Sequence, residues 1–129
     1  MINWDGLNFI PEEFECRCGC GEIKVEPLLV DTLQEIRTSY GRTMNVTSGY
    51  RCVAHPVEMA KINGGGKPGS HSTGKAADIA CRGSDALDLL RIALNNPNIR
   101  GVGVNQKGPK RFIHLDILED WPRPNIWSY

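Results

Sequence analysis

The chain has 129 residues, a length that fits one domain able to bury a sizeable core without crosslinks. Its 15 basic and 15 acidic residues give a formal net charge of zero, which argues against long-range attraction to nucleic acid or to an anionic membrane surface. No apolar run approaches the roughly 18 residues that span a bilayer, so we expect no membrane insertion. We therefore expect residues 1–129 to form a single globular domain, and a monomer.

The N-terminal segment MINWDGLNFIPEEF lacks the basic start and the apolar stretch of a secretion signal. We expect the protein to be made in the cytoplasm without a signal peptide. Action outside the cytoplasm would then depend on a separate route of delivery.

Five cysteines are present, an odd number that argues against a complete disulfide framework. Three of them, Cys16, Cys18 and Cys20, lie in the segment CRCGCG, and Cys52 and Cys81 lie far along the chain. We interpret them as buried thiols, because an unpaired cysteine behaves as a small hydrophobic residue. Two alternatives stay open: a disulfide from the triplet to Cys52, and a second metal site, although CxCxC departs from the paired CxxC of zinc ribbons.

The first helix is predicted to begin at Pro27, because a first helical turn tolerates proline, and to end at Gly41. The apolar stripe at helical spacing between these two residues consists of Leu29, Leu33, Ile36 and Tyr40. A short strand is predicted at residues 44–47. Residues 53–75 are rich in glycine and proline and are predicted as a long loop that can include one helical turn around residues 57–62.

The second half of the chain is predicted to contain three strands and one helix. Residues 76–81 form the first strand, and Ser84 is the expected N-cap of a helix that residues 95–97 stop. The buried stripe of this helix is predicted to be Leu87, Leu90 and Leu94. Residues 101–105 and 111–118 are the other strands. The tail is predicted to be irregular, held down by Trp121 and Trp127, and its aromatic residues are assigned to the core rather than to a site.

Ionisable residues occupy one face of two predicted strands. Because side chains alternate across a strand, Asp78 lies on the face opposite to Ile79, and His114 and Asp116 lie on the face opposite to Leu115. The apolar faces can then pack against the helices, and the opposite face collects the two carboxylates and the imidazole. An aspartate is tolerable in this place because a cation would compensate for its burial.

His71 comes from the loop directly before the strand that carries Asp78. Two histidines and one carboxylate are a suitable set of ligands for catalytic zinc, which takes three protein ligands and keeps one position open. His71, Asp78 and His114 are therefore the candidate metal ligands, for Zn²⁺. The alternative for His114 is a hydrogen-bonded histidine of the core.

Several segments together resemble one metallopeptidase superfamily. These segments are SGYRC at residues 48–52, His55, the glycines at 64–65, GSHSTGKAADI at residues 69–79, and GVGV followed by FIHLDI. In this order they are similar to the zinc D-alanyl-D-alanine carboxypeptidases and the phage endolysin peptidases, whose fold the hedgehog signalling domain shares. The resemblance covers most of the chain.

The resemblance implies an α+β fold with a small central antiparallel sheet and helices packed on one face. It places the zinc ligands of the superfamily on His71, Asp78 and His114. It places a catalytic and substrate-binding arginine, which holds a carboxylate or carbonyl near the metal, on Arg51. Ser70 and His55 are the further expected substrate contacts.

One departure from the superfamily concerns the general base. Many relatives carry a glutamate shortly before the last zinc histidine, and here those positions read GPKRFI, without a carboxylate. Asp116 is the candidate catalytic base, because it shares a strand face with His114. Its alternative role is to orient a ligand histidine by a hydrogen bond. His55 and Glu58 are weaker candidates for the base.

The expected function is zinc-dependent hydrolysis of a peptide bond in bacterial peptidoglycan, by a carboxypeptidase or an endopeptidase. The expected setting is the cell wall, reached after release in phage lysis or as part of a phage particle. The alternative is a non-catalytic zinc-containing module that binds the wall or a partner protein. A third possibility, a cysteine-zinc module that binds nucleic acid, is disfavoured by the zero net charge.

Overall fold

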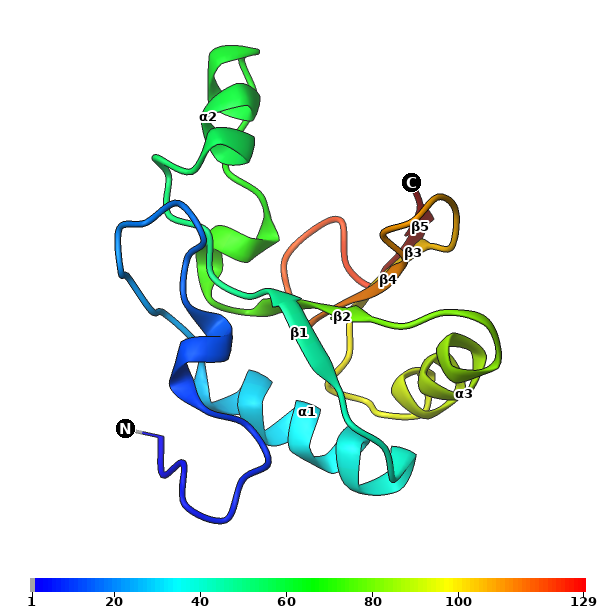
Figure 1. Ribbon diagram of the computed structural model, residues 1–129. Helices are drawn as coiled ribbons and strands as arrows, with labels where there is room; N and C mark the ends of the chain where they lie inside the picture. Colours follow the sequence, from blue (N-terminus) through cyan, green and yellow to red (C-terminus); the bar gives the residue numbers. More distant parts are fainter. Residues whose placement is uncertain (1) are drawn as a thin grey trace.

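The computed structural model describes residues 2–129 and has an α+β fold built on one five-stranded sheet (Figure 1). Three α-helices are present in these residues: α1 (Pro27–Tyr40), α2 (Pro56–Asn63) and α3 (Gly83–Leu94). The strands are β1 (Asn45–Ser48), β2 (Ala76–Ala80), β3 (Gly101–Asn105), β4 (Phe112–Asp116) and β5 (Asn125–Ser128). Within the described part of the chain, no helix has the length and apolar character to cross a membrane.

The strands of the sheet follow the order β1-β2-β4-β3-β5. The first four pair antiparallel, as expected, and β5 adds a parallel edge strand beside β3. Asp78 on β2 lies directly opposite His114 on β4, and Gly103 on β3 lies opposite His114 from the other side. The register therefore brings the ionisable residues of β2 and β4 to the middle of the sheet.

The hydrophobic core lies between one face of the sheet and the helices α1 and α3. Leu33 from α1 and Leu89 from α3 are fully buried there, together with Ile79, Ile113 and Leu115 from the sheet. Figure 1 shows α1 and α3 below the sheet, whereas α2 projects away from it. The opposite face is left free for the polar residues, which confirms the division of the strand faces predicted from alternation.

Helix α1 agrees with its prediction at both ends. Pro27 is its first residue, and Gly41 follows it with φ of 70°, in the left-handed region that glycine adopts without strain. Within the predicted loop of residues 53–75, the helical turn expected around residues 57–62 is longer than predicted, because the eight residues of α2 are helical. Its N-cap is His55, whose Nδ1 accepts a hydrogen bond from the N–H of Val57 at 3.1 Å.

Helix α3 buries a different stripe from the one predicted. Ala86, Leu89 and Ala93 are buried, whereas Leu87 and Leu94 are 48% and 57% exposed. Small alanines on the inner face let the helix lie close to its neighbours, which hydrophobicity alone does not reveal. The predicted N-cap was also wrong: Arg82 precedes the helix and Ser84 lies within its first turn.

The C-terminal tail is more regular than predicted, because residues 125–128 form β5. Trp127 on this strand is half-buried, but Trp121 is 93% exposed and anchors nothing. The prediction of Trp121 as an anchor was therefore wrong.

Candidate metal centre

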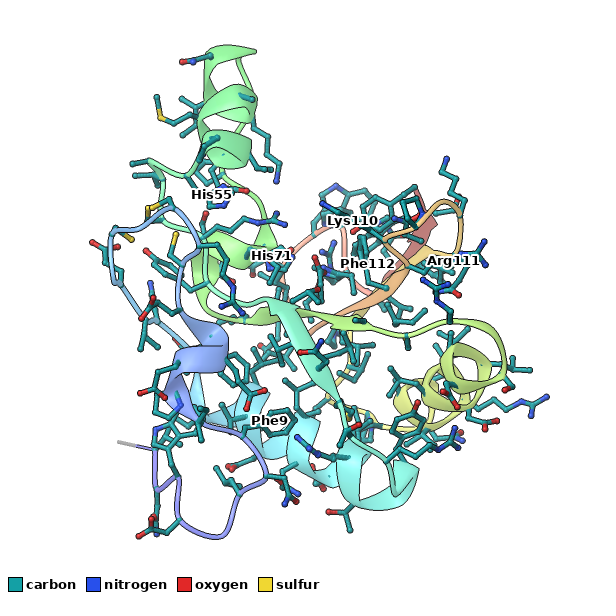
Figure 2. All side chains as sticks on the ribbon, in the orientation of Figure 1. Phe9, His55, His71, Lys110, Arg111 and Phe112 are labelled. Atoms are coloured by element: carbon teal, nitrogen blue, oxygen red, sulfur yellow. The ribbon has the colours of Figure 1, made fainter. Side chains whose placement is uncertain are left out.

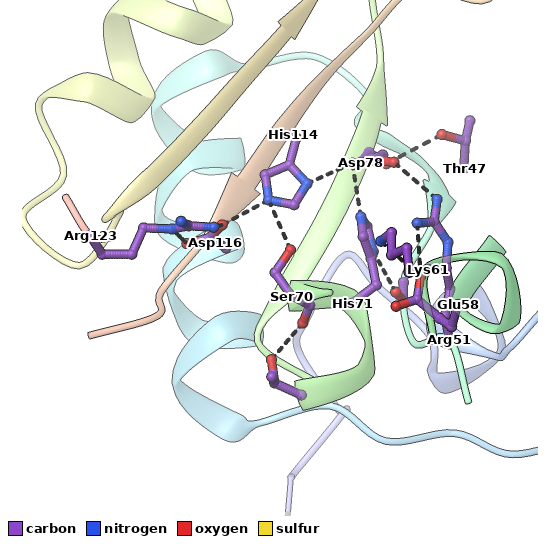
Figure 3. A network of polar contacts seen from close by, with 12 residues as sticks. Thr47, Arg51, Glu58, Lys61, Ser70, His71, Asp78, His114, Asp116 and Arg123 are labelled. Carbon is purple, nitrogen blue, oxygen red and sulfur yellow. Dashed lines mark hydrogen bonds and ion pairs between the residues drawn. The ribbon is translucent and has the colours of Figure 1, made fainter. Parts of the chain in front are cut away.

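Three candidate ligands converge on the polar face of the sheet. Asp78 from β2, His114 from β4 and His71 from the short 3₁₀ helix at residues 70–73 are all buried. The Oδ1 atom of Asp78 lies 3.2 Å from Nε2 of His71 and 3.0 Å from Nδ1 of His114. One ligand atom from each residue lies within 4.8 Å of the other two. Figure 3 shows the two rings and the carboxylate turned toward a common point.

The ring of His71 is oriented by the backbone. Its Nδ1 lies 2.7 Å from the carbonyl oxygen of Gly49, and because a carbonyl only accepts, Nδ1 carries the hydrogen and donates it. In the neutral ring, Nε2 then keeps its lone pair and directs it toward Asp78. This is the tautomer that a metal ligand requires.

The ring of His114 is oriented by a second carboxylate. Its Nε2 lies 2.8 Å from Oδ2 of Asp116, while Nδ1 faces Asp78. Arg123 in turn donates from Nε to Oδ1 of Asp116 at 3.0 Å and from its terminal nitrogen to Oδ2 at 2.8 Å. Asp116 is fully buried by this arrangement. A carboxylate that holds the second nitrogen of a histidine is the usual support of a metal ligand.

The charged groups of the cluster shift one another's pKa values. Burial by itself would raise the pKa of Asp78, but hydrogen bonds with His114 and His71 lower it below its ordinary range. Burial would lower the pKa of His114, and its contacts with Asp116 and Asp78 raise it instead. The pKa of Asp116 is lowered against the effect of burial by His114 and Arg123. The carboxylates therefore stay ionised, and the site is prepared for a cation.

The donor set fits a zinc ion. Zinc lies about 2.0–2.2 Å from nitrogen and oxygen ligands, so two ligands at corners of a tetrahedron lie about 3.4 Å apart. The separations of 3.0 and 3.2 Å between Asp78 and the two rings require only a small adjustment. Two imidazoles and one carboxylate also leave a fourth position without a protein ligand.

The predicted substrate-binding residues, Arg51, Ser70 and His55, lie around the three candidate metal ligands. A terminal nitrogen of Arg51 lies 3.8 Å from Oδ2 of Asp78, and another lies 3.6 Å from Glu58. Oγ of Ser70 lies 3.5 Å from Nε2 of His114. His55 lines a cavity beside the three candidate ligands, together with Arg51 and Asp78.

Two residues of the site were missed by sequence reasoning. Arg123 fixes Asp116, and the ring of Trp127 lies against that of His114 with centroids 5.0 Å apart. Both come from the tail, where no local pattern marks them as belonging to a site. The available signals are two glycines of β3: a side chain at Gly103 would collide with Trp127 Nε1 at 2.6 Å, and one at Gly101 would collide with Arg123 and Asp116.

Two cavities adjoin at the metal-ligand cluster, which is formed by His71, Asp78 and His114. One, of about 400 Å³, is lined by the three candidate ligands, Ser70, Trp127 and Tyr129 among others. The other, of about 780 Å³, shares Arg51, Asp78 and Phe112 with it. In Figure 2, His55 and His71 lie on one side of this region, and Lys110, Arg111 and Phe112 lie on the other.

The larger cavity is markedly basic. Its only carboxylate among residues 2–129 is Asp78, whereas its cationic residues are Arg17, Arg51, Arg82, Lys110 and Arg111. The neutral chain thus concentrates positive charge where a ligand would enter, which favours an anionic ligand.

Comparison with known proteins supports the same reading of the site. The family model described as Peptidase M15 matches residues 7–116, a span that includes every candidate metal ligand. A search of curated proteins found no match.

Proposed function

The chain belongs to the peptidase M15 family, a family of metallopeptidases, and from this premise we propose that it hydrolyses a peptide bond in bacterial peptidoglycan with a zinc ion held by His71, Asp78 and His114. The observation that carries the proposal is the convergence of these three ligand atoms beside a basic cavity. When bound, the zinc supplies Lewis acidity toward a peptide carbonyl and toward water.

Arg51 binds an anionic group of the substrate in this proposal. Its guanidinium lies beside Asp78 at the junction of the two cavities, and it is partly accessible, with 19% of the side chain exposed. A guanidinium matches a carboxylate with two parallel hydrogen bonds. The free carboxylates of cell-wall stem peptides are suitable partners for this residue and for the other cations of the larger cavity.

His55 is a donor to the substrate rather than a base. Its Nδ1 accepts the N–H of Val57, so the neutral ring carries its hydrogen on Nε2. Burial, and then the charge of Arg51, lower the pKa of His55, which keeps the ring neutral at physiological pH. Nε2 then offers a hydrogen to a substrate carbonyl.

Asp116 acts as a positioning residue in the proposal. Its oxygens accept from His114, Arg123 and the N–H of Leu118, and its side chain has no exposed surface. It therefore fixes the ring of His114 and lies away from the ligand atoms that face Asp78.

We infer an endopeptidase rather than a carboxypeptidase. The support is that the two cavities share Asp78 in their linings, so that in this proposal a substrate chain extends through both. Cleavage would take place at the cell wall, by the monomer, after delivery from the cytoplasm in phage lysis or as part of a phage particle.

The test is digestion of purified peptidoglycan with the zinc-loaded protein, followed by mass spectrometry of the soluble products. We expect peptide fragments whose new termini identify one bond. Asp78→Ala should abolish their release, and Asp31→Ala, a change of an exposed aspartate on α1, should leave it unchanged. Release by Asp78→Ala at the normal rate would contradict the ligand assignment.

A second candidate function is binding to the wall without cleavage. It is favoured because two candidates for the general base are inaccessible to a substrate. Asp116 and Glu58 are fully buried and hydrogen-bonded, and neither lines the two cavities. Co-sedimentation with peptidoglycan in the absence of any soluble product would select this function. In that case Lys110→Glu with Arg111→Glu should weaken the sedimentation, because these residues contribute to the basic cavity.

A further inference from the structure

A second group of potential ligands lies outside the site described above. The sulfur atoms of Cys16, Cys18, Cys20 and Cys52 gather at one point, with one sulfur from each residue within 4.8 Å of the other three. Cys52 Sγ lies 3.7, 3.5 and 3.8 Å from those of Cys16, Cys18 and Cys20. Sulfur atoms of Cys16 and Cys18 are 3.4 Å apart. The fifth cysteine, Cys81, directly follows β2, is not part of the cluster and donates to the carbonyl of Ile79 at 3.4 Å.

From this cluster we propose that the protein holds a structural zinc ion bound by four thiolates. Zinc lies about 2.3 Å from thiolate sulfur, so the sulfurs of a tetrahedral site lie about 3.8 Å apart. The observed separations of 3.4 to 3.8 Å approach this value without a metal being imposed on the side chains. Four protein ligands complete the coordination, so the site is closed and structural rather than catalytic.

Disulfide formation explains the cluster less well. A disulfide selects one partner and brings two sulfurs to about 2.05 Å, whereas Cys52 is nearly equidistant from three others. The interpretation as buried thiols holds for Cys16 and Cys52 but was wrong for Cys18 and Cys20, which are exposed. Two exposed thiols, those of Cys18 and Cys20, that lie close to two buried thiols are typical of a metal site at the surface.

Backbone hydrogen bonds stabilise negative charge on the cysteine sulfurs. The N–H of Cys52 donates to Sγ of Cys16 at 3.3 Å, and that of Glu22 donates to Sγ of Cys20 at 3.4 Å. Such bonds stabilise thiolates that lose their protons to bind the metal. The glycines between and after the cysteines make the tight turns possible: Gly19 and Gly21 have φ of 93° and 75°.

The zinc would fasten two distant segments next to the metal-ligand cluster. Cys52 directly follows Arg51, and the turn before it carries Gly49, whose carbonyl orients His71. The cysteine-bearing loop is separated from Cys52 by more than 30 residues of sequence. This turn already packs on the N-terminal segment, where Gly49 lies against the backbone of Phe14 and the N–H of Tyr50 donates to the carbonyl of Phe14 at 3.0 Å. The metal would therefore fix the turn that carries Arg51.

The experiment measures zinc and iron in the protein purified under reducing conditions without chelators, by plasma mass spectrometry. We expect about two zinc ions per chain and no iron. The double variant Cys18→Ser, Cys20→Ser should retain one zinc ion, and the matched control Cys81→Ser should retain both. A single zinc ion in the unmodified protein that is unaffected by the double substitution would overturn the proposal, as would iron in place of zinc.

The variant Asp78→Ala separates this proposal from the proposed function. It should lose the zinc ion of the histidine site and keep that of the cysteines. If it loses none while the cysteine variant loses one, the histidine site is wrong and the cysteine site stands.

Cobalt substitution tests the unmodified chain and does not depend on the folding of a variant. Cobalt bound to thiolates gives intense charge-transfer absorption in the near ultraviolet, and the histidine site contains no sulfur. We expect this absorption in the unmodified protein and in Asp78→Ala. Its absence from the cobalt-loaded unmodified protein would refute the thiolate site.

Discussion

The hydrogen-bonded chain from Arg123 through Asp116 to His114 leads to a specific prediction for Asp116→Asn. The two oxygens of Asp116 accept hydrogens on both sides, from His114 Nε2 at 2.8 Å and from Arg123 at 2.8 and 3.0 Å. Asparagine has only one accepting oxygen, so either amide orientation turns its NH₂ group toward a donor. The substitution therefore either releases the ring of His114 or leaves Arg123 with a buried, poorly paired charge.

The expected loss of zinc affinity follows from this conflict. Removing a partner that orients a metal ligand typically weakens metal binding about 10–100-fold, which corresponds to about 1.4–2.8 kcal/mol. The metal-free protein should also lose about 3–5 kcal/mol of stability, because Asp116 is fully buried and only 11% of the Arg123 side chain is exposed.

The assay is competition for zinc with a chromophoric chelator at neutral pH, together with thermal unfolding of the metal-free protein. Measurement in the Cys18→Ser, Cys20→Ser background isolates the histidine site from the cysteine cluster. Glu119→Gln, which changes an exposed carboxylate three residues away, is the matched control. Zinc affinity within twofold of the unmodified protein would refute the idea that Asp116 acts through His114.

Three further predictions concern the core and the buried charges. Leu89→Ala on α3 should lower the free energy of unfolding by about 2–5 kcal/mol in urea titrations, because Leu89 is fully buried, whereas Leu87→Ala should change it by less than about 1 kcal/mol. Equal losses would mean that the buried stripe of α3 is misassigned. Gly49→Ala should lower the melting temperature, at a cost of about 1–3 kcal/mol, because the added Cβ would lie 2.6 Å from Cα of Phe14; an unchanged melting temperature would contradict this packing. Burial would raise the pKa of Glu58, but hydrogen bonds and nearby cations lower it, so its contribution to stability is present above about pH 4.3 and is lost as the pH falls through the lowered pKa. Glu58→Gln should therefore be less stable than the unmodified protein at pH 7, with a difference that shrinks in urea titrations below about pH 4; a difference that does not depend on pH would rule out this linkage.

Much of the fold was predictable because local rules govern it. Helix α1 begins at a proline, whose fixed φ suits the first helical turn. It is followed by a glycine, which adopts the left-handed conformation without strain. The strands β2 and β4 follow from alternation, and that alternation placed Asp78 and His114 on one face. Helix α3 was predicted as a helix but with the wrong buried face. Both leucines and alanines can form an apolar face, and the close packing against neighbouring elements selects the face with the alanines.

The candidate metal ligands were predictable from the sequence, but the residues that hold these ligands in place were not. His71, Asp78 and His114 were identified by residue type and order, and the structure brings them together. Arg123 lies seven residues beyond Asp116, in a tail without periodicity, and nothing local indicates that the two side chains meet. Trp127 was assigned to the core on composition and instead lies against His114.

The sequence by itself determined helix α1, the presence of α3 and the faces of β2 and β4, because each depends on backbone periodicity within a few residues. It also supplied the residue types of the candidate ligands. Tertiary structure alone decided which ring nitrogens face Asp78, that Asp116 is held by Arg123, and that four cysteines meet. Cys16 and Cys52 are 36 residues apart, as are Asp78 and His114. Contacts across such separations arise when the whole chain closes around its core, and no local pattern encodes their geometry.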